Sequence, residues 1–241
     1  MSVSELASGF ETMSSALPEA VNYHRWILDL IRPYAGGHLL EVGFGYGQYT
    51  RPLAALVERL VAIDVDPRCL AIGESMPENV ELILADLSQE NFAARVEEGR
   101  YDAAICLNVL EHLDDDLGAL RSLAACLRPG GNLLLLVPAH PALYGPMDKM
   151  AGHFRRYTRS VLRARFEQAG FGLRVLSYVN PLGGLGWWVN ARFGKPTGLS
   201  DPSINRQILW FDRYVQPVSR LLTPLTSRFF GQSLWAVGVR A

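Results

Sequence analysis

Cysteine is scarce in this chain: Cys69, Cys106 and Cys126 are the only three among 241 residues, and none belongs to a Cys-x-x-Cys pair. A disulfide framework or a zinc site is therefore not expected, and a reducing compartment such as the cytoplasm fits best. The formal net charge is only -1, which argues against a protein that binds nucleic acid through a global field. Met1–Gly9 lack the basic start and apolar stretch of a signal peptide, and no run of about 18 apolar residues predicts a membrane-spanning helix.

The start of the chain divides into an aperiodic and a periodic segment. Residues 1–17 are small and polar, which predicts a mobile N-terminal arm. From Pro18 onward, apolar residues recur at intervals of three and four and predict a helix with one apolar face. The members of that face are Tyr23, Trp26, Ile27, Leu30, Ile31 and Tyr34.

Short apolar segments then alternate with helical patterns. The expected strands are His38–Val42, Leu60–Ile63, Val80–Ala85, Tyr101–Leu107 and Asn132–Val137. The expected helices are Gln48–Arg59, Pro67–Ser75, Ser88–Glu98 (with Ser88 as its N-cap) and Leu113–Leu127. Continuous apolar strands separated by helices indicate an α/β fold with a mostly parallel, doubly wound sheet covered on both faces. The ligand crevice of such a sheet lies at the carboxyl ends of its strands.

Two further strands, Gly172–Val179 and Ser233–Val239, are expected to complete a seven-stranded sheet after a helix at Thr158–Gly170. The stretch between these strands is rich in glycine and proline but also in tryptophan and phenylalanine, which a plain linker would not carry. The sequence therefore predicts a helical cap over the crevice, inserted before the last strand. The expected division is a core of residues 18–180, a cap of residues 181–232 and a last core strand in residues 233–241.

A glycine-rich segment, Glu41–Gly47, stands where the first strand turns into the first helix of the core. Glycines let the backbone adopt positive φ and approach a ligand closely. An ordinary strand-to-helix turn is one alternative, and a nicotinamide site is another. The nicotinamide fingerprint is Gly-x-Gly-x-x-Gly, whereas the spacing here is Gly-x-Gly-x-Gly.

Acidic residues follow the next two strands. Asp64 ends the second strand, where a carboxylate can accept both hydroxyls of a ribose. Asp66 competes for this role, but it lies beyond the strand end and can instead open the next helix. Asp86 follows the third strand and is suited to accept from the exocyclic amine of adenine, or to cap the helix after it.

These segments together resemble the class I S-adenosylmethionine (SAM)-dependent methyltransferases, in particular bacterial enzymes that act on small molecules. Leu40–Gly47 looks like their glycine motif, Asp64 matches their ribose-binding acid and Asp86 matches the acid beside adenine. Tyr101–Leu113 looks like the motif that faces the methionine part, and Leu127–Gly131 like the turn before the fifth strand. Phe44 and Tyr46 depart from the small residues often found at their positions. The resemblance implies a Rossmann-like fold and SAM as cofactor, and no metal.

By this resemblance Glu41 orients the methionine amine through the loop, and the three glycines admit the methionine tail. The full expected cofactor set is Tyr23, Glu41, Gly43, Gly45, Gly47, Asp64, Val65, Asp86, Leu87, Asn108, Val109 and Leu110. An aromatic face beside a sulfonium gains a cation–π attraction of about 1 kcal/mol, which suits Tyr23 or Trp26. The alternative is that both side chains only pack against the sheet.

The segments that follow the fifth strand concentrate polar side chains at the crevice. His140 is the first candidate for a general base, because imidazole titrates near neutrality, and His153 is the second. Tyr144 is a third candidate, either in catalysis or as a pocket wall. Each histidine can alternatively be a loop residue bonded to the backbone.

The sequence therefore predicts a cytoplasmic enzyme that methylates a small, largely apolar molecule on oxygen, nitrogen or carbon, a reaction of the kind found in secondary metabolism. The alternatives are a SAM-binding accessory protein without catalysis and, less favoured, an NAD-dependent oxidoreductase. No nucleic-acid partner is expected. The aromatic cap suits a lid over a hydrophobic substrate, a peripheral membrane contact or a homodimer contact.

Overall fold

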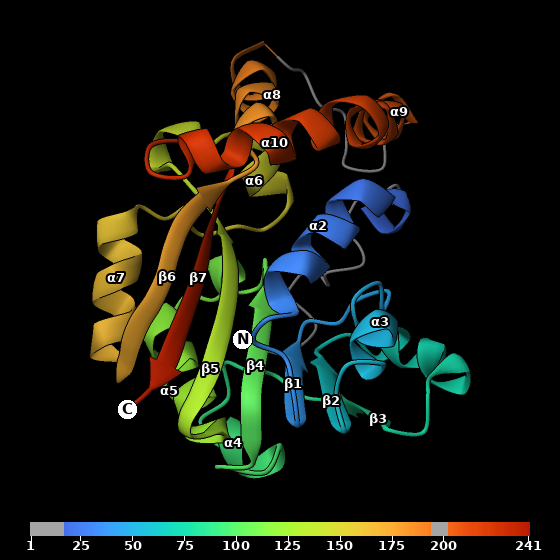
Figure 1. Ribbon diagram of the computed structural model, residues 1–241, viewed down its shortest axis with the longest axis vertical. Helices are drawn as coiled ribbons and strands as arrows, with labels where there is room; N and C mark the ends of the chain where they lie inside the picture. Colours follow the sequence, from blue (N-terminus) through green and yellow to red (C-terminus); the bar gives the residue numbers. More distant parts are fainter. Residues whose placement is uncertain (1–16, 194–201) are drawn as a thin grey trace.

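The computed structural model describes residues 17–193 and 202–241, so the arm expected in residues 1–17 lies almost entirely outside the described residues. In the described part of the chain, seven strands form one sheet in the order β3-β2-β1-β4-β5-β7-β6 (Figure 1). The strands are β1 (His38–Val42), β2 (Arg59–Asp64), β3 (Val80–Leu84), β4 (Tyr101–Leu107), β5 (Leu127–Pro138), β6 (Phe171–Val179) and β7 (Ser233–Arg240). β7 runs antiparallel to β5 and β6, and the other neighbouring pairs are parallel. The expected doubly wound α/β fold is confirmed.

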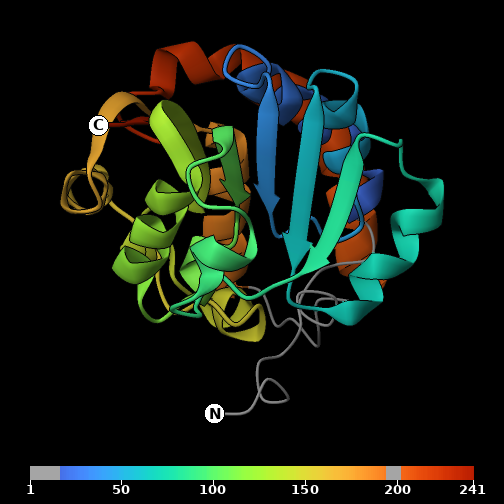
Figure 2. The same cartoon turned by 90° about the horizontal axis from the view of Figure 1, so that it is seen from below.

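Helices cover both faces of this sheet (Figure 2). One face packs against α2 (Val21–Ile31), α3 (Thr50–Ala54) and η2 (Pro67–Ser75), and the other against α4 (Phe92–Arg95), α5 (Asp116–Cys126) and α7 (Arg159–Gln168). Successive strand residues point to opposite faces, so Leu39 belongs to the first buried cluster and Leu40 to the second. Burial on both faces is the reason that the strands read as continuous apolar runs.

Three helices of the core are shorter or tighter than the sequence pattern predicted. The pattern at Gln48–Arg59 yields only α3, and the pattern at Pro67–Ser75 yields a 3-10 helix rather than an α-helix. Ser88 caps no helix, because its backbone N–H and hydroxyl both donate to Asp86, at 2.8 and 2.7 Å, in a local turn. α4 therefore begins at Phe92.

Two other boundaries follow from local hydrogen bonds. The fourth core helix is α5, which begins at Asp116 instead of Leu113 because the Asp115 carboxylate caps it by accepting from the Gly118 N–H at 2.8 Å. The expected N-cap at Thr158 is confirmed by a bond of 3.2 Å from the Val161 N–H to its hydroxyl. The turn expected within Leu127–Gly131 lies inside β5. At this point the pairing of β5 with β4 shifts in register.

The segment between β6 and β7 folds into helices at the carboxyl ends of the parallel strands (Figure 1). These elements are α8 (Pro181–Phe193), α9 (Pro202–Trp210), the π-helix η5 (Phe211–Val215) and α10 (Gln216–Thr226). Shorter elements at the same edge are η3 (Leu110–His112), η4 (Pro141–Leu143) and α6 (Pro146–Met150). Helices therefore stand where the sequence predicted a cap.

The cap also holds the start of α2. Asp212 in η5 is buried, and its carboxylate accepts the backbone N–H groups of Asn22 and Tyr23 at 3.0 and 2.8 Å. Ala20, at the N-cap position of α2, has no side chain that could satisfy these amides. A cap residue thus supplies the missing N-terminal acceptor of α2 from far along the chain and fixes the position of Tyr23.

Candidate functional site

The glycine loop lies between β1 and α3 in a left-handed conformation. Gly43, Gly45 and Gly47 have φ angles of 77°, 52° and 74°, which side chains of L-residues rarely adopt. A Cβ atom added to Gly43 would lie 2.4 Å from the side chain of Val109. The loop therefore runs close against the segment after β4, with Gly43 itself exposed.

Asp64 at the end of β2 is bonded to this loop. Its Oδ2 accepts the N–H of Gly45 at 3.0 Å, and its Oδ1 accepts the N–H of Asp66 at 3.0 Å. Asp66 is buried, caps η2 and binds the Arg68 guanidinium at 2.7 Å. Asp64 is thus bonded directly to the glycine loop, and Asp66 opens η2. Val65, between them, is 38% exposed at the same edge of the sheet.

The acid after β3 is engaged locally. The Asp86 carboxylate is half-buried and accepts from Ser88, so part of its hydrogen-bonding capacity is used within the loop. The side chain of Leu87 is buried in the core cluster with Phe92. Leu87 could therefore meet a ligand mainly through its backbone.

Glu41 is a buried carboxylate beneath the glycine loop. Burial raises its pKa to about 7, and the nearby charge of Asp64 acts in the same direction. Its Oε2 has no hydrogen-bond partner among the described residues. A buried carboxylate with a free oxygen is suited to accept from a cationic or amide donor brought by the loop or by a ligand.

The segment after β4 and the start of α2 meet at the same edge. Asn108 has a φ of 53°, and its side chain lies near the Tyr23 hydroxyl, where it lowers the pKa of that group. Burial raises the pKa of Tyr23 to about 12, and the charge of Glu111 adds to this shift. Trp26 is 4% exposed and packs in the cluster between α2 and the sheet. Leu110 is buried on the opposite face, whereas Tyr23 and Asn108 place polar groups at this edge.

Glu111, His112 and His153 come together beside Asn108, which the sequence analysis did not foresee. One ligand-type atom of each lies within 4.8 Å of the others. Glu111 is fully buried, and neither carboxylate oxygen bonds to another described residue; Oε1 lies 3.9 Å from Nε2 of His153. Burial raises the pKa of Glu111 to about 7, while burial and His153 lower that of His112 to about 4. The expected absence of a metal stays a prediction.

The buried Glu111 predicts a pH-dependent stability. Its folded pKa of about 7 lies above its ordinary value of 4.5, so its neutral form stabilises the fold fully below pH 4.5, and this contribution is lost as pH rises through 7. Glu111→Gln should therefore change the free energy of unfolding little at pH 5 and increase it by up to about 3 kcal/mol at pH 8.

Urea unfolding at both pH values measures this difference. Glu58→Gln, at an exposed position, is the matched control and should change neither value. An equal effect of Glu111→Gln at pH 5 and pH 8 would contradict the assignment, because a packing change alone does not depend on pH.

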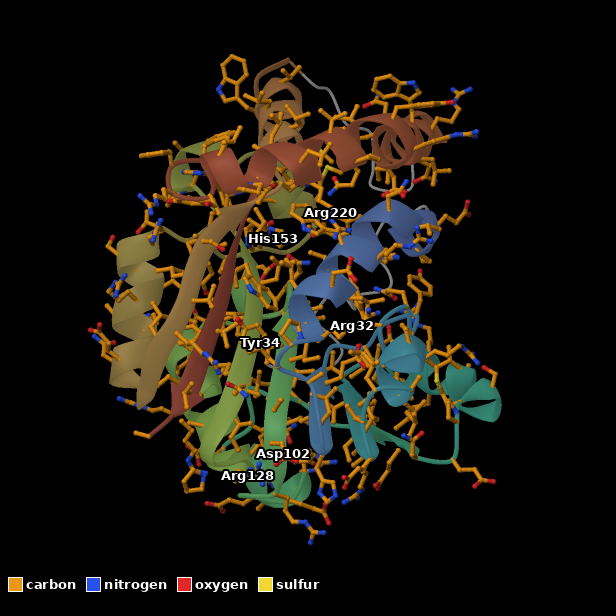
Figure 3. All side chains as sticks on the ribbon, in the orientation of Figure 1. Arg32, Tyr34, Asp102, Arg128, His153 and Arg220 are labelled. Carbon is orange, nitrogen blue, oxygen red and sulfur yellow. The ribbon has the colours of Figure 1, made fainter. Side chains whose placement is uncertain are left out.

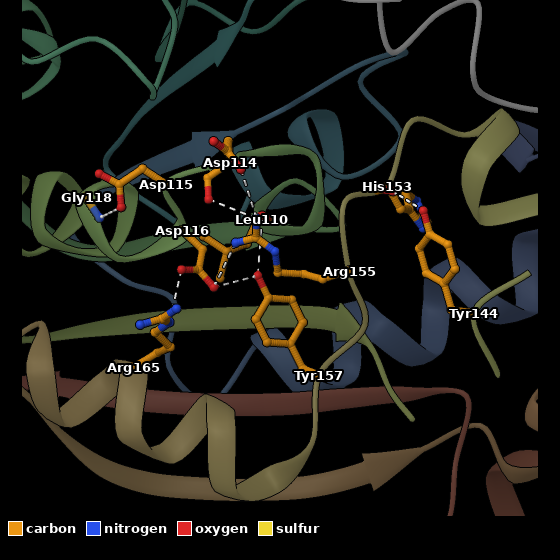
Figure 4. A network of polar contacts seen from close by, with 10 residues as sticks. All are labelled: Leu110, Asp114, Asp115, Asp116, Gly118, Tyr144, His153, Arg155, Tyr157 and Arg165. Atoms are coloured by element: carbon orange, nitrogen blue, oxygen red, sulfur yellow. Dashed lines mark hydrogen bonds and ion pairs between the residues drawn. The ribbon is translucent and has the colours of Figure 1, made fainter. Parts of the chain in front are cut away.

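His153 is held by a carboxylate on its other ring nitrogen. Its Nδ1 lies 2.9 Å from Oδ1 of Asp148, which is fully buried. Asp148 also accepts from Nε of Arg156 at 2.8 Å and from the N–H of Gly145 at 2.9 Å. Although burial opposes it, these partners hold the pKa of Asp148 below its usual value. The Tyr144 hydroxyl donates to the backbone carbonyl of His153 at 2.7 Å (Figure 4), so Tyr144 positions the loop.

His140 lies in a different environment. Its ring stacks between Tyr178 and Phe230, with centroid distances of 4.6 and 5.2 Å. Burial lowers its pKa, and the charge of Arg156 adds to this. Its Nε2 is buried without a hydrogen-bond partner among the described residues. The first candidate for a base is thus a ring packed between aromatic groups, and no carboxylate of the described residues bonds to it.

The two adjacent arginines of this region point to different partners. Arg156 is buried, binds Asp148 and lies 4.7 Å from the ring centroid of Trp187 in α8. Arg155 binds the buried Asp116 at 3.3 Å, where the Tyr157 hydroxyl also donates at 3.2 Å (Figure 4). Arg155 therefore fixes the segment to the start of α5, and Arg156 links the His153–Asp148 pair to the cap.

A hollow lies at the opposite end of the sheet. Tyr34, Asp102 and Arg128 line it, and Figure 3 shows Asp102 and Arg128 far from His153. Asp102 accepts the N–H of His38 at 2.7 Å and pairs with Arg128 at 2.6 Å. These bonds satisfy the acid within the protein, whereas Oδ1 of Asn132 in the same lining is buried without a hydrogen-bond partner among the described residues.

The edge at the carboxyl ends of the strands brings together the kinds of group that the sequence predicted for a SAM site. The glycine loop leaves backbone exposed at Gly43, and Glu41 beneath it keeps an unpaired oxygen. Asp64 stands at the end of β2, next to the loop, as a ribose-binding acid requires. The expected cofactor residues from β1 through η3 therefore gather at one edge, as their order in the sheet demands.

Comparisons with known proteins give the family. A family described as "Methyltransferase domain" matches residues 19–175. A ubiquinone biosynthesis O-methyltransferase of Xanthomonas campestris is 34% identical over 102 residues, which is 42% of this chain and 42% of that protein. The chain thus matches less than half the length of this curated relative.

Solved structures share the fold at low identity. A SAM-dependent methyltransferase of Mesorhizobium loti has a TM-score of 0.62 at 16% identity, covering 90% of this chain and 98% of its own. A Haloferax volcanii methyltransferase, solved with the Trm112 methyltransferase activator, has a TM-score of 0.62 at 17% identity, covering 92% and 91%. Because the family match covers well over half of the chain, this protein belongs to the methyltransferase-domain family of class I SAM-dependent methyltransferases.

Proposed function

We propose that this protein transfers the methyl group of SAM to a small, largely apolar molecule, and that His153 accepts the proton that the acceptor atom loses. The observation that carries the proposal is the pair of His153 and Asp148 at the edge of the sheet that holds the glycine loop. Family membership gives SAM as the cofactor. When bound, SAM supplies a methyl group activated by its positively charged sulfur.

The residues that would hold SAM come from successive strand ends. Asp64 would accept the ribose hydroxyls and Asp86 the adenine amine, with Val65 and Leu87 beside them. Glu41, the glycines, Tyr23 and the segment Asn108–Leu110 would surround the methionine part. Because these groups belong to one rigid sheet edge, they can hold the reacting carbon in a fixed orientation.

The proton has a defined destination in this arrangement. Asp148 accepts from Nδ1–H of His153, so Nε2 is the nitrogen left to take a proton from a hydroxyl or amine. Arg156 and the Gly145 N–H keep Asp148 ionised, and Asp148 would stabilise the imidazolium that forms. The acceptor atom would then bond to the methyl carbon with the electron pair of the broken O–H bond, or of the broken N–H bond of a protonated amine, and the electron pair of the carbon–sulfur bond would stay on the sulfur.

Two observations bear on the acceptor: the first favours an apolar molecule and the second an oxygen atom. Cap helix α8 places Trp187 against Arg156, next to the His153–Asp148 pair. The Xanthomonas relatives are named for O-methylation in ubiquinone biosynthesis, which favours an oxygen atom as the acceptor. A role in secondary metabolism and a cytoplasmic location stay predictions.

Transfer of tritium from methyl-labelled SAM to a panel of apolar phenols, catechols and amines tests the proposal. Labelled product with at least one phenol or catechol is expected. Binding of SAM in calorimetry without turnover on any compound would instead favour an accessory protein. A change of NADH absorbance would favour the oxidoreductase.

The cap offers a matched pair of tryptophans for a second test. Trp187 is half-buried and contacts Arg156, whereas its neighbour Trp188 is 43% exposed. Trp187→Ala should raise KM for the acceptor by roughly tenfold, because an aromatic contact contributes about 1 kcal/mol or more. Trp188→Ala should change KM less than twofold. If both variants had the same KM as the unchanged protein, the cap would not be part of the substrate site.

A further inference from the structure

The outer face of α9, η5 and α10 exposes large apolar side chains in a continuous stripe. The most exposed are Leu221, Leu225 and Phe229, at 77%, 76% and 75%. The stripe continues through Trp210, Tyr214 and Val218, at 59%, 56% and 47%. All six recur at intervals of three or four. The five from Trp210 to Leu225 therefore lie on one side of the helical segment, and Phe229 follows in the turn after α10. We name these six residues the outer stripe.

The outer stripe faces solvent, because the opposite face of the same helices is bonded to the rest of the protein. Asp212 caps α2, and Ser219 is buried, donating to Asn180 at 2.8 Å and accepting from the Leu182 N–H at 3.1 Å. Gln216 is also buried on that side. The segment is thus fixed by polar bonds on its inner face and keeps its apolar side chains towards solvent.

The charges beside the outer stripe have one sign. Residues 202–232 contain four arginines and a single acid. Arg206, Arg213, Arg220 and Arg228 are all exposed, whereas the acid, Asp212, is buried and bonded to α2. Arg220 pairs with Asp29 at 2.9 Å, and the other three arginines form no ion pair with the described residues. This face is therefore both apolar and cationic.

The exposed apolar side chains and the arginines beside them favour a lipid surface as the partner of this face. Exposed apolar patches mark interaction sites, and an amphipathic helix with arginine on its border and Trp, Tyr, Leu and Phe along its apolar side suits a lipid–water interface. A second copy of the same face would bring arginines against arginines. None of the described helices is long and apolar enough to cross a bilayer, so any contact through this face lies on the membrane surface.

We propose that the outer stripe and its arginines dock on the surface of an anionic lipid bilayer. The apolar side chains enter the boundary between headgroups and acyl chains, and the arginines meet the anionic headgroups. Cap helix α8, which contacts α10, also exposes Leu185, Trp188 and Val189, at 53%, 43% and 48%. Docking in this way turns the carboxyl end of the sheet towards the membrane.

Sedimentation of the full chain with vesicles tests the proposal. The protein should bind vesicles of phosphatidylcholine mixed with an equal amount of phosphatidylglycerol, bind pure phosphatidylcholine at least roughly tenfold more weakly, and dissociate at high salt. The triple variant Leu221→Ser, Leu225→Ser, Phe229→Ser should lose vesicle binding by roughly tenfold or more and keep its folded circular dichroism spectrum. Arg213→Gln with Arg228→Gln should weaken binding to the anionic vesicles alone.

The control is Val161→Ser, a substitution at an apolar residue of α7 that is 46% exposed outside the outer stripe. It should leave vesicle binding unchanged. Absence of binding to anionic vesicles overturns the proposal. So does a dimer in sedimentation velocity that the triple variant dissociates, because the stripe would then be covered by a second copy. The readout does not involve methyl transfer, so its failure is distinct from failure of the proposed function.

Discussion

Replacing Asp64 with alanine should weaken binding of SAM by roughly 10²- to 10⁴-fold. Each hydrogen bond to a charged acceptor contributes about 1.5 to 3 kcal/mol, and the two ribose hydroxyls would lose both. The substitution also removes the acceptor for the Gly45 N–H, so the glycine loop loses an anchor. Isothermal calorimetry with SAM measures the affinity. Asp64→Asn keeps one acceptor oxygen, so its affinity should lie between those of Asp64→Ala and the unchanged protein.

Asp102→Ala provides the matched control for this loss. Asp102 is half-buried like Asp64 and also accepts a backbone N–H, but it lies at the opposite end of the sheet. Both variants should lower the free energy of unfolding, whereas only Asp64→Ala should lose SAM affinity. Unchanged affinity in a folded Asp64→Ala variant would contradict the cofactor site at its centre.

The strands could be predicted from the sequence because a buried parallel strand has few alternatives. β1 and β4 have the bounds that their apolar runs predicted, since every residue between those bounds meets a covered face or pairs with a neighbour. The helices were harder, because side chains compete for the backbone at their ends. Asp86 draws Ser88 into a local turn, and Asp115 starts α5 later than its apolar pattern suggests.

The acids and glycines of the candidate cofactor site could be found because each follows its own strand. Parallel topology then gathers them at one edge. The cluster of Glu111 and His153 had no such signal, because its members belong to segments that meet only in three dimensions. The cap of α2 by Asp212 is equally non-local. A helix without a capping side chain at Ala20 was the one local sign that an acceptor had to come from elsewhere.

His153→Ala should lower kcat by roughly 10²- to 10⁴-fold while leaving the affinity for SAM within about twofold, the effect expected for loss of a general base. Asp148→Asn should lower kcat by a smaller factor, because a neutral amide no longer stabilises the imidazolium. Single-turnover transfer of labelled methyl to the best acceptor of the panel measures both. The pH profile separates them: the limb assigned to the base should vanish in His153→Ala and move to lower pH in Asp148→Asn.

His140→Asn is the competing variant, because asparagine tolerates the left-handed backbone that His140 adopts with a φ of 60°. It should destabilise the stack with Tyr178 and Phe230 yet keep kcat within roughly threefold. Tyr144→Phe removes only the bond to the His153 carbonyl, and it should also keep kcat within roughly threefold. The opposite pattern, with activity lost in His140→Asn and kept in His153→Ala, would make the stacked histidine the base. Asp148 would then serve only to anchor Arg156 beneath the cap.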